Sequence, residues 1–219
     1  LNIECYYLYC DSDPRFPNHH PDPSVKENNK DLAEKVKELG YDIGIGIDGD
    51  ADRVGVVLEN GEYILTDLVM LIFYCALEDK IKNRKAVFDV KCSKTLIDGL
   101  EALNIPYEMY RTGASYLNYK ANTDNYDFAG EFSGHLYFGD KYMRFDDGIY
   151  AGVRLIEILS NTNLKASELL NNINKYYQTD EIKVKVTDET KFAIVDKVKQ
   201  YCIDSGYSFI DIDGVSKDS

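Results

Sequence analysis

Three aspartates and an arginine in one short stretch are the residues of this sequence with the clearest potential for chemistry. Asp48, Asp50 and Asp52 alternate with small residues, and Arg53 follows directly. Carboxylates at this spacing repel one another unless a cation lies among them, and oxygen ligands favour a hard ion such as Mg²⁺ or Ca²⁺. The planar guanidinium of Arg53 suits a phosphate group beside that ion. A surface turn of solvated aspartates is the alternative.

A strand is predicted on each side of these aspartates. Isoleucines alternate with glycines over residues 43–47, the period of a buried strand, and valines begin a second strand at residue 54. A helix over 27–39, ended by Gly40, precedes the pair. Residues 3–10 also have the composition of a strand, so the chain is predicted to begin with alternating strands and helices.

Two later segments place polar side chains where a predicted strand ends, the usual position of active sites in α/β proteins. Lys91 follows a strand over 86–90 and precedes a helix capped by Ser93. Its ammonium could bind an anion at the helix N-terminus, or it could simply be solvated. Arg111 ends the next strand beside Gly113, and this segment is either an anion or sugar contact or an ordinary loop.

A third segment contains Glu131, Ser133 and His135 between two glycines. In an extended backbone these alternating residues would face the same way. A carboxylate, a hydroxyl and an imidazole on one side suit a polyhydroxylated ligand. An imidazole titrates near neutrality, so His135 could move a proton, with a structural histidine as the alternative. Asp146 and Asp147 are expected to cap the helix that follows.

The remaining pattern alternates helices and strands and therefore predicts an α/β fold. The predicted helices are 67–80 (capped by Thr66), 94–103, 115–122, 148–159, 167–176 and 191–202. The predicted strands are 107–110, 127–130, 136–138, 182–186 and 207–212, and Asn60 and Gly61 form a hairpin turn.

Charge and composition exclude several classes of partner. Lys and Arg total 25 against 38 Asp and Glu, a net charge of −13, which argues against nucleic acid. No apolar run reaches the roughly 18 residues of a membrane span. The five cysteines form no C-x-x-C pair, which indicates reduced thiols and a cytoplasmic protein. An anionic small substrate remains possible, because a metal and a few arginines can reverse the field locally.

In order and spacing, these segments resemble the α-D-phosphohexomutase superfamily, specifically its bacterial phosphomannomutase/phosphoglucomutase branch. The matching stretches are 16–23, 48–53, 89–92, 112–115, 130–135 and 145–150. The resemblance implies two successive α/β/α sandwich domains with mixed sheets, followed by the incomplete start of an α+β domain. The implied boundaries are 1–62 for part of domain 2, 63–178 for domain 3 and 179–219 for the start of domain 4.

The resemblance also implies an activity. Such enzymes interconvert hexose 1-phosphate and hexose 6-phosphate, of mannose or glucose, through an enzyme phosphoserine and a hexose 1,6-bisphosphate intermediate. The carboxylates of Asp48, Asp50 and Asp52 would hold Mg²⁺ together with the phosphoserine, and Arg53 would contact the transferring phosphoryl group.

The other site residues are also assigned through the resemblance. Lys91 and His135 are the proton-transfer candidates, and their roles as acid or base stay open. The implied substrate contacts are Arg111, Ser115, Glu131, Ser133 and His135. Many relatives have lysine and histidine where this chain has Arg111 and Ala114, so the sugar preference stays open.

Two parts of the family pattern have no match in this sequence: the serine loop that carries the phosphoryl group and the domain 4 loop that binds the substrate's phosphate. We therefore expect the chain to be a segment of a longer protein. It would be inactive alone and would work with the missing domains of the same polypeptide.

Three alternatives are open. A haloacid-dehalogenase-type phosphatase would use Asp48 as its nucleophile, although Asp52 departs from that motif. An EF-hand would use the three aspartates and Glu59 as calcium ligands, although Arg53 stands where glycine is required. A segment that binds metal and sugar phosphate without catalysis is the third.

Overall fold

The computed structural model describes residues 3–77, 85–171, 173, 174, 176, 179, 182 and 184–209. The chain divides into two compact units, 1–176 and 177–219. Among the described residues, no helix combines the length and the apolar character needed to cross a bilayer. The helices of the first unit are η1 (Lys26–Asn29), α1 (Lys30–Leu39), α2 (Thr66–Ala76), α4 (Lys94–Ala102), α5 (Ala114–Thr123), α6 (Gly148–Ser160) and η2 (Ala166–Leu170).

The first sheet is antiparallel and has the order β1 (Ile43–Ile47), β2 (Val54–Leu58) and β3 (Tyr63–Ile64). Its register pairs Ile47 with Val54, so residues 48–53 must turn the chain within one tight loop. This loop carries the three aspartates. The predicted strands and the turn at residues 60–61 are confirmed.

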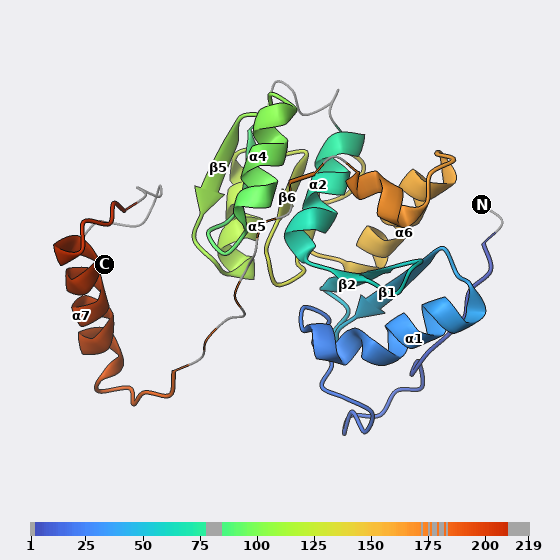
Figure 1. Ribbon diagram of the computed structural model, residues 1–219, viewed down its shortest axis with the longest axis horizontal. Helices are drawn as coiled ribbons and strands as arrows, with labels where there is room; N and C mark the ends of the chain where they lie inside the picture. Colours follow the sequence, from blue (N-terminus) through green and yellow to red (C-terminus); the bar gives the residue numbers. More distant parts are fainter. Residues whose placement is uncertain are drawn as a thin grey trace. The chain divides into compact units, whose positions relative to one another are not determined.

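Helices cover both faces of the first sheet (Figure 1). Side chains alternate between the faces of a strand. The position of a Cβ on Gly44 lies against Val36 of α1, whereas the next residue, Ile45, lies against Gly152 of α6. The β1–β2 hairpin therefore lies between α1 and α6.

The second sheet is mixed and has the order β5 (Tyr107–Tyr110), β4 (Ala86–Asp89), β6 (Phe128–Gly130) and β7 (Leu136–Phe138). β4 is parallel to β5 and β6, and β7 is antiparallel to β6. Phe88 and Phe128 belong to the main core cluster with α2 and α4. Val87 and Ala129, one residue away, are buried on the face that α5 covers. This arrangement of helices on both faces of a sheet confirms the predicted α/β class.

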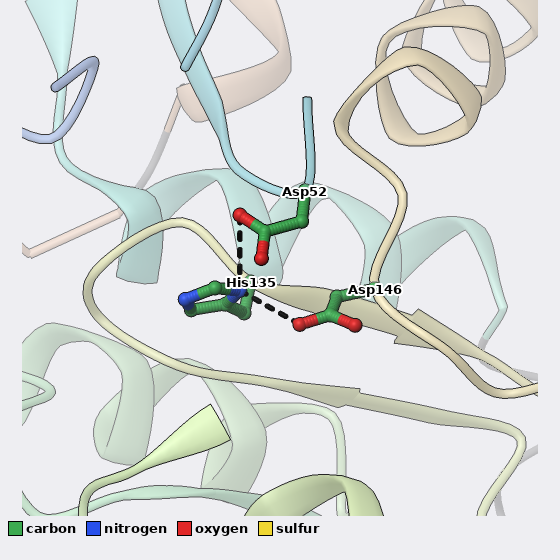
Figure 2. A group of neighbouring side chains, drawn as sticks. All are labelled: Asp52, His135 and Asp146. Carbon is green, nitrogen blue, oxygen red and sulfur yellow. Dashed lines mark ion pairs between the residues drawn. The ribbon is translucent and has the colours of Figure 1, made fainter. Parts of the chain in front are cut away.

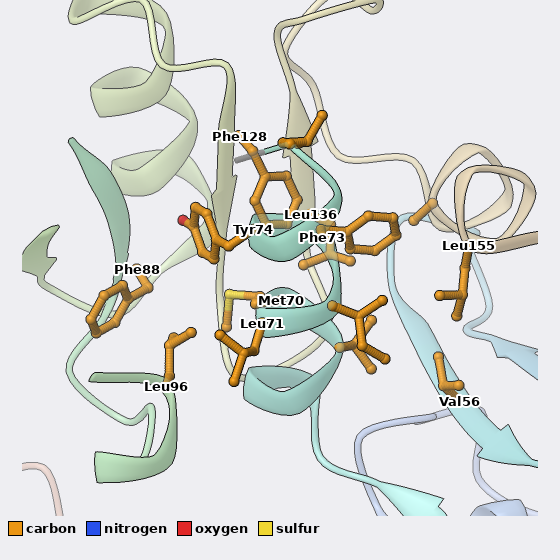
Figure 3. Packing of buried hydrophobic residues seen from close by; sticks show 14 of the residues in the cluster. Val56, Met70, Leu71, Phe73, Tyr74, Phe88, Leu96, Phe128, Leu136 and Leu155 are labelled. Atoms are coloured by element: carbon orange, nitrogen blue, oxygen red, sulfur yellow. The ribbon is translucent and has the colours of Figure 1, made fainter. Parts of the chain in front are cut away.

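Helix α2 joins the two sheets. Figure 3 shows it between Phe88, on the second sheet, and Val56, on the first. The ring of Phe73 lies with its centroid 5.3 Å from that of Phe128 and 4.9 Å from that of Phe138. Because one core cluster includes residues of both sheets, the loops that leave them are held in a fixed relation.

Several predicted details of the first unit are confirmed. The α1 C-cap is Gly40 in the left-handed conformation. Ser93 accepts a hydrogen bond from the amide of Thr95, and Asp147 accepts one from Tyr150, as N-cap residues do.

Other predictions for this unit are wrong. Residues 3–10 form no strand, because a strand needs a neighbouring backbone to pair with. Thr66 lies inside α2, with Leu65 as the N-cap. The helix predicted over 167–176 forms only as the 3₁₀ turn η2: residues 171, 173, 174 and 176 are not helical, and residues 172 and 175 are not among the described residues. Of the helix predicted over 67–80, residues 78–80 lie outside the described part of the chain.

The second unit contains α7 (Lys191–Asp204), which confirms the helix predicted over 191–202. Its predicted strands are not formed at residues 182, 184–186 and 207–209, and residues 210–212 lie outside the described range. A single strand without a paired neighbour is not stable in water. The described residues of this unit provide no such neighbour.

The core position of Phe73 gives a test of the fold. Phe73→Ala should lower the free energy of unfolding by about 3–5 kcal/mol, because it leaves a cavity at the junction of the two sheets. Urea unfolding followed by circular dichroism measures the loss. The control is Tyr119→Ala on α5, where the side chain is 69 % exposed and the change should stay within about 0.5 kcal/mol. Equal losses in the two variants would contradict a central role for α2.

Candidate active site

Asp48 organises the loop between β1 and β2, residues 48–53, which we call the metal loop. Its side chain is buried, and its Oδ1 accepts hydrogen bonds from the backbone amides of Asp52 at 3.0 Å and Arg53 at 3.1 Å. Carboxylate oxygens of Asp48, Asp50 and Asp52 all lie within 4.8 Å of one another. An all-oxygen donor set of this kind fits a hard divalent cation.

Arg53 is held at two points. Its Nε donates to Asp48 Oδ2 at 2.7 Å, and one terminal nitrogen donates to Asp22 Oδ1 at 3.2 Å. Asp22 comes from the proline-rich loop, whose residues Phe16 and Pro21 pack against the backbone of the metal loop. Burial raises the pKa of Asp48, but hydrogen bonds and charge from Arg53 outweigh it and hold that pKa below its ordinary value.

Asp52 is a carboxylate of this loop whose pKa is raised. Its pKa is raised to about 6, mainly by burial, with the negative charges of Asp48 and Asp50 adding to the effect and His135 opposing it. A carboxylate in these surroundings is stabilised by any cation that joins it. The electrostatics of the loop therefore fit a metal site.

The segment that contains His135 is attached directly to the metal loop. Val54 N–H donates to the carbonyl oxygen of Gly134 at 3.1 Å, and Arg53 and His135 form an antiparallel bridge. Gly134 has φ of 109°, and a Cβ there would lie 2.9 Å from the Val54 oxygen. Only glycine permits this approach, which places His135 beside the aspartates.

The start of α6 meets the same loop. Gly148 N–H donates to the Ala51 carbonyl at 2.9 Å, and a Cβ on Gly148 would lie 2.4 Å from the Arg53 carbonyl oxygen. This close packing places the two aspartates before α6, Asp146 and Asp147, at the edge of the metal loop. Both were expected as helix caps, and only Asp147 is one.

Asp146 instead faces His135. His135 Nδ1 lies 2.8 Å from Asp146 Oδ2 and 3.7 Å from Asp52 Oδ1 (Figure 2). Burial lowers the pKa of His135, but the Asp146 carboxylate beside Nδ1 and the charge of Asp52 outweigh it, so the pKa is raised. The sequence held one signal for this role: a helix has one N-cap, so two consecutive aspartates leave one carboxylate for another partner.

Residues 131–135 form a tight turn between β6 and β7, which makes the expected extended conformation wrong. The side chains are nevertheless gathered. Burial, together with the charge of Asp89, raises the pKa of Glu131, and the charge of the nearby His135 opposes this rise. Among the described residues, Glu131 Oε2 and the Ser133 hydroxyl are buried without a hydrogen-bond partner. Buried polar atoms are normally paired, so these two fit contact with a polar ligand.

Two other predicted site residues, Lys91 and Arg111, lie in loops at the same edge of the second sheet. The register pairs Asp89 with Tyr110, so Lys91 and Arg111 follow neighbouring strand ends. Lys91 is exposed, and its charge also lowers the pKa of Glu131. The guanidinium of Arg111 lies 3.7 Å from the centroid of the Tyr116 ring.

Ser115 is the predicted site residue that lies on a helix. It is exposed in the first turn of α5. The structure therefore gathers Asp48, Asp52, Arg53, Glu131, Ser133 and His135 in direct or electrostatic contact, and it places Lys91, Arg111 and Ser115 on the loops around them.

The contact between His135 and Asp146 can be tested by titration. Asp146→Asn should lower the pKa of His135, because it removes the negative charge that lies 2.8 Å from Nδ1 and favours the imidazolium, so less of the imidazole is charged at pH 7. Nuclear magnetic resonance of the imidazole in the metal-free chain measures the pKa. Asp147→Asn is the control and should leave it unchanged. An unchanged pKa in Asp146→Asn would contradict the pairing.

Comparison with known proteins agrees with this geometry. Residues 66–177 match the family profile described as phosphoglucomutase/phosphomannomutase, alpha/beta/alpha domain III, and residues 1–61 match the profile of alpha/beta/alpha domain II. A phosphomannomutase/phosphoglucomutase of Pseudomonas putida is 40% identical over 187 residues, covering 85% of this chain and 40% of the relative. A phosphoglucomutase of Neisseria meningitidis serogroup A is 39% identical over 184 residues, covering 84% of this chain and 40% of the relative.

A solved structure gives the same result. The phosphoglucomutase/phosphomannomutase family protein of Burkholderia thailandensis superposes with a TM-score of 0.77 at 32% identity, covering 96% of this chain and 43% of that one. The chain thus spans about two-fifths of the proteins it matches. By profile, sequence and structure, the chain belongs to the phosphoglucomutase/phosphomannomutase family.

Proposed function

We propose that the protein containing this chain interconverts hexose 1-phosphate and hexose 6-phosphate, of mannose or glucose. The chain would supply the metal loop and the turn of residues 131–135, which we call the sugar-recognition turn. One observation carries the proposal: the backbone of the metal loop pairs directly with residues 134 and 135 of the turn. A cation site, an arginine and groups for sugar hydroxyls are thereby combined in one place.

The metal loop would act on the phosphoryl group. Asp48, Asp50 and Asp52 would hold Mg²⁺, which supplies positive charge against the negative charge of a transferring phosphoryl group. Arg53, fixed by Asp48 and Asp22, would direct its remaining N–H groups to the same phosphoryl oxygens. The phosphoserine donor and the loop that binds the second phosphate of hexose 1,6-bisphosphate would come from domains of the same polypeptide outside this chain.

The turn would recognise the sugar. Glu131 can accept hydrogen bonds from two hydroxyls, and the Ser133 hydroxyl can either donate or accept. Arg111 and Ser115 would add contacts from the neighbouring loop. A hexose can bind in two orientations. If each orientation presents an equivalent pair of hydroxyls, the same side chains can recognise both.

Proton transfer is proposed for Lys91 and His135. Asp146 engages Nδ1 of His135, which leaves Nε2 for the hydroxyl that attacks or leaves. A partner that fixes the ring and stabilises its protonated form is the usual support for a histidine that exchanges protons.

The alternatives are less well supported. Both oxygens of Asp48 accept hydrogen bonds within the loop, which leaves it a poor nucleophile for a phosphatase. An EF-hand is wrong, because strands β1 and β2 flank the loop where helices should. A segment that binds ligands without catalysis is decided by the second experiment below.

Partners and location are also proposals. We expect no nucleic-acid partner, given the net charge of −13. A cytoplasmic location is supported by the five cysteines, none of which forms a disulfide.

The first test addresses the cation. Asp50→Asn should weaken the binding of Mn²⁺, a paramagnetic probe of the Mg²⁺ site, by about tenfold or more, because it removes one of three anionic ligands. Electron paramagnetic resonance of the chain measures free Mn²⁺. Asp42→Asn, an exposed position before β1, is the matched control. Equal affinities in the two variants would contradict the site.

The second test addresses catalysis. In the whole protein, Glu131→Gln should lower kcat/KM for hexose 1-phosphate by about 10- to 100-fold, the value of a charged hydrogen bond. A coupled assay of hexose 6-phosphate, with hexose 1,6-bisphosphate as activator, measures it, and Glu34→Gln on the exposed face of α1 is the control. The chain alone should be inactive. Turnover by the chain alone would contradict the need for further domains, and an inactive whole protein would leave only ligand binding.

A further inference from the structure

The last residue of β4, Asp89, is an acidic side chain that the proposed chemistry does not use. It is completely buried at the carboxyl edge of the second sheet. Its two oxygens accept three hydrogen bonds: Oδ1 from the Phe132 amide at 2.9 Å and from Cys92 Sγ at 3.2 Å, and Oδ2 from Thr112 Oγ1 at 2.8 Å.

The three donors come from three different loops. Cys92 follows β4, Thr112 follows β5, and Phe132 follows β6. These segments lie far apart in the chain and meet at this carboxylate.

Each donor is also the direct neighbour of a residue proposed to act on the substrate. Cys92 follows Lys91, Thr112 follows Arg111, and Phe132 lies between Glu131 and Ser133. A shift of one donor would move the adjacent functional side chain by a similar amount. The positions of the three groups relative to one another therefore depend on Asp89.

We propose that Asp89 is a positioning residue that holds the loops after β4, β5 and β6 in a fixed arrangement relative to one another. The catalytic part of this proposal rests on the proposed mutase function. A carboxylate suits the task, since an anion accepts several hydrogen bonds at once and binds each more strongly than a neutral acceptor does. An asparagine of the same shape carries no charge and has one acceptor oxygen, so it would accept more weakly from the Phe132 amide and Cys92 Sγ, and its amide nitrogen would require the Thr112 hydroxyl to accept instead of donate.

The three loops differ in how much they depend on Asp89. The loop after β4 has a second anchor, because the Ser93 amide donates to Asp67 Oδ2 at 3.0 Å. Loss of the Asp89 carboxylate should therefore disturb the 111–113 and 131–135 segments more than the 90–93 segment.

The first experiment needs no catalysis. In the 219-residue chain, hydrogen–deuterium exchange at residues 131–135 and 111–113 should rise by about tenfold or more in Asp89→Asn. Asp140→Asn is the matched control, because Asp140 is another buried carboxylate, paired with Arg154, whose loss should destabilise the fold without exposing these segments. Unchanged exchange in Asp89→Asn, or the same rise in Asp140→Asn, would overturn the proposal.

The second experiment separates positioning from stability in the whole protein. Thr112→Val removes one donor to Asp89, and Thr112→Ser keeps it. We expect kcat/KM for hexose phosphate to fall by about 10- to 100-fold in Asp89→Asn and Thr112→Val, as displacement of catalytic groups by about 1 Å does. Thr112→Ser should stay within about twofold, and Mn²⁺ affinity should be unchanged in all three.

The outcomes are distinguishable. Equal activity in Thr112→Val and Thr112→Ser would overturn the role of the hydroxyl bond to Asp89. Weaker Mn²⁺ binding in Asp89→Asn would show general damage to the site and would also overturn it. If the unaltered whole protein has no mutase activity, the proposed function fails, and the exchange experiment still decides whether Asp89 holds the loops.

Discussion

Where β2 begins, the amide of Val54 donates to the carbonyl oxygen of Gly134, 3.1 Å away. This bond joins a loop of the first sheet to a turn of the second. At this junction the aspartates of one lie beside the imidazole of the other. Its geometry requires glycine at position 134, whose backbone conformation and lack of a side chain allow the two segments to touch. The remaining contacts of the site are arranged around this junction.

Acidic groups dominate the surroundings of the junction. Asp52, Asp146 and the other carboxylates of the metal loop gather around one arginine and one histidine. The positive charge of Arg53 compensates the negative charge of Asp48, and His135 does the same for Asp146. Asp52 keeps a raised pKa. The compensation is therefore incomplete within the described residues. A bound cation would complete it, which is a physical reason for the concentration of aspartates at this place.

Much of the fold could be predicted from local pattern. The alternating isoleucines and valines indicated β1 and β2, and the caps at Gly40, Ser93 and Asp147 followed from residue type. Where the structure describes the segments 3–10, 182–186 and 207–212, the strands expected there are not formed, because a strand depends on a partner elsewhere in the chain and no local pattern supplies one. The roles of Asp22 and Asp146 were missed for the same reason, since each acts on a residue that the sequence does not place beside it.

The core around α2 has a further consequence for how a mutase of this kind would work. Val56 of the first sheet and Phe88 of the second pack into one cluster, so the metal loop and the sugar-recognition turn belong to a single rigid platform. A platform of this kind does not move with a bisphosphate whose two phosphate ends exchange positions. On the proposed function, the bisphosphate would therefore reorient against a stationary surface. Any motion that releases it would come from parts of the protein beyond this platform.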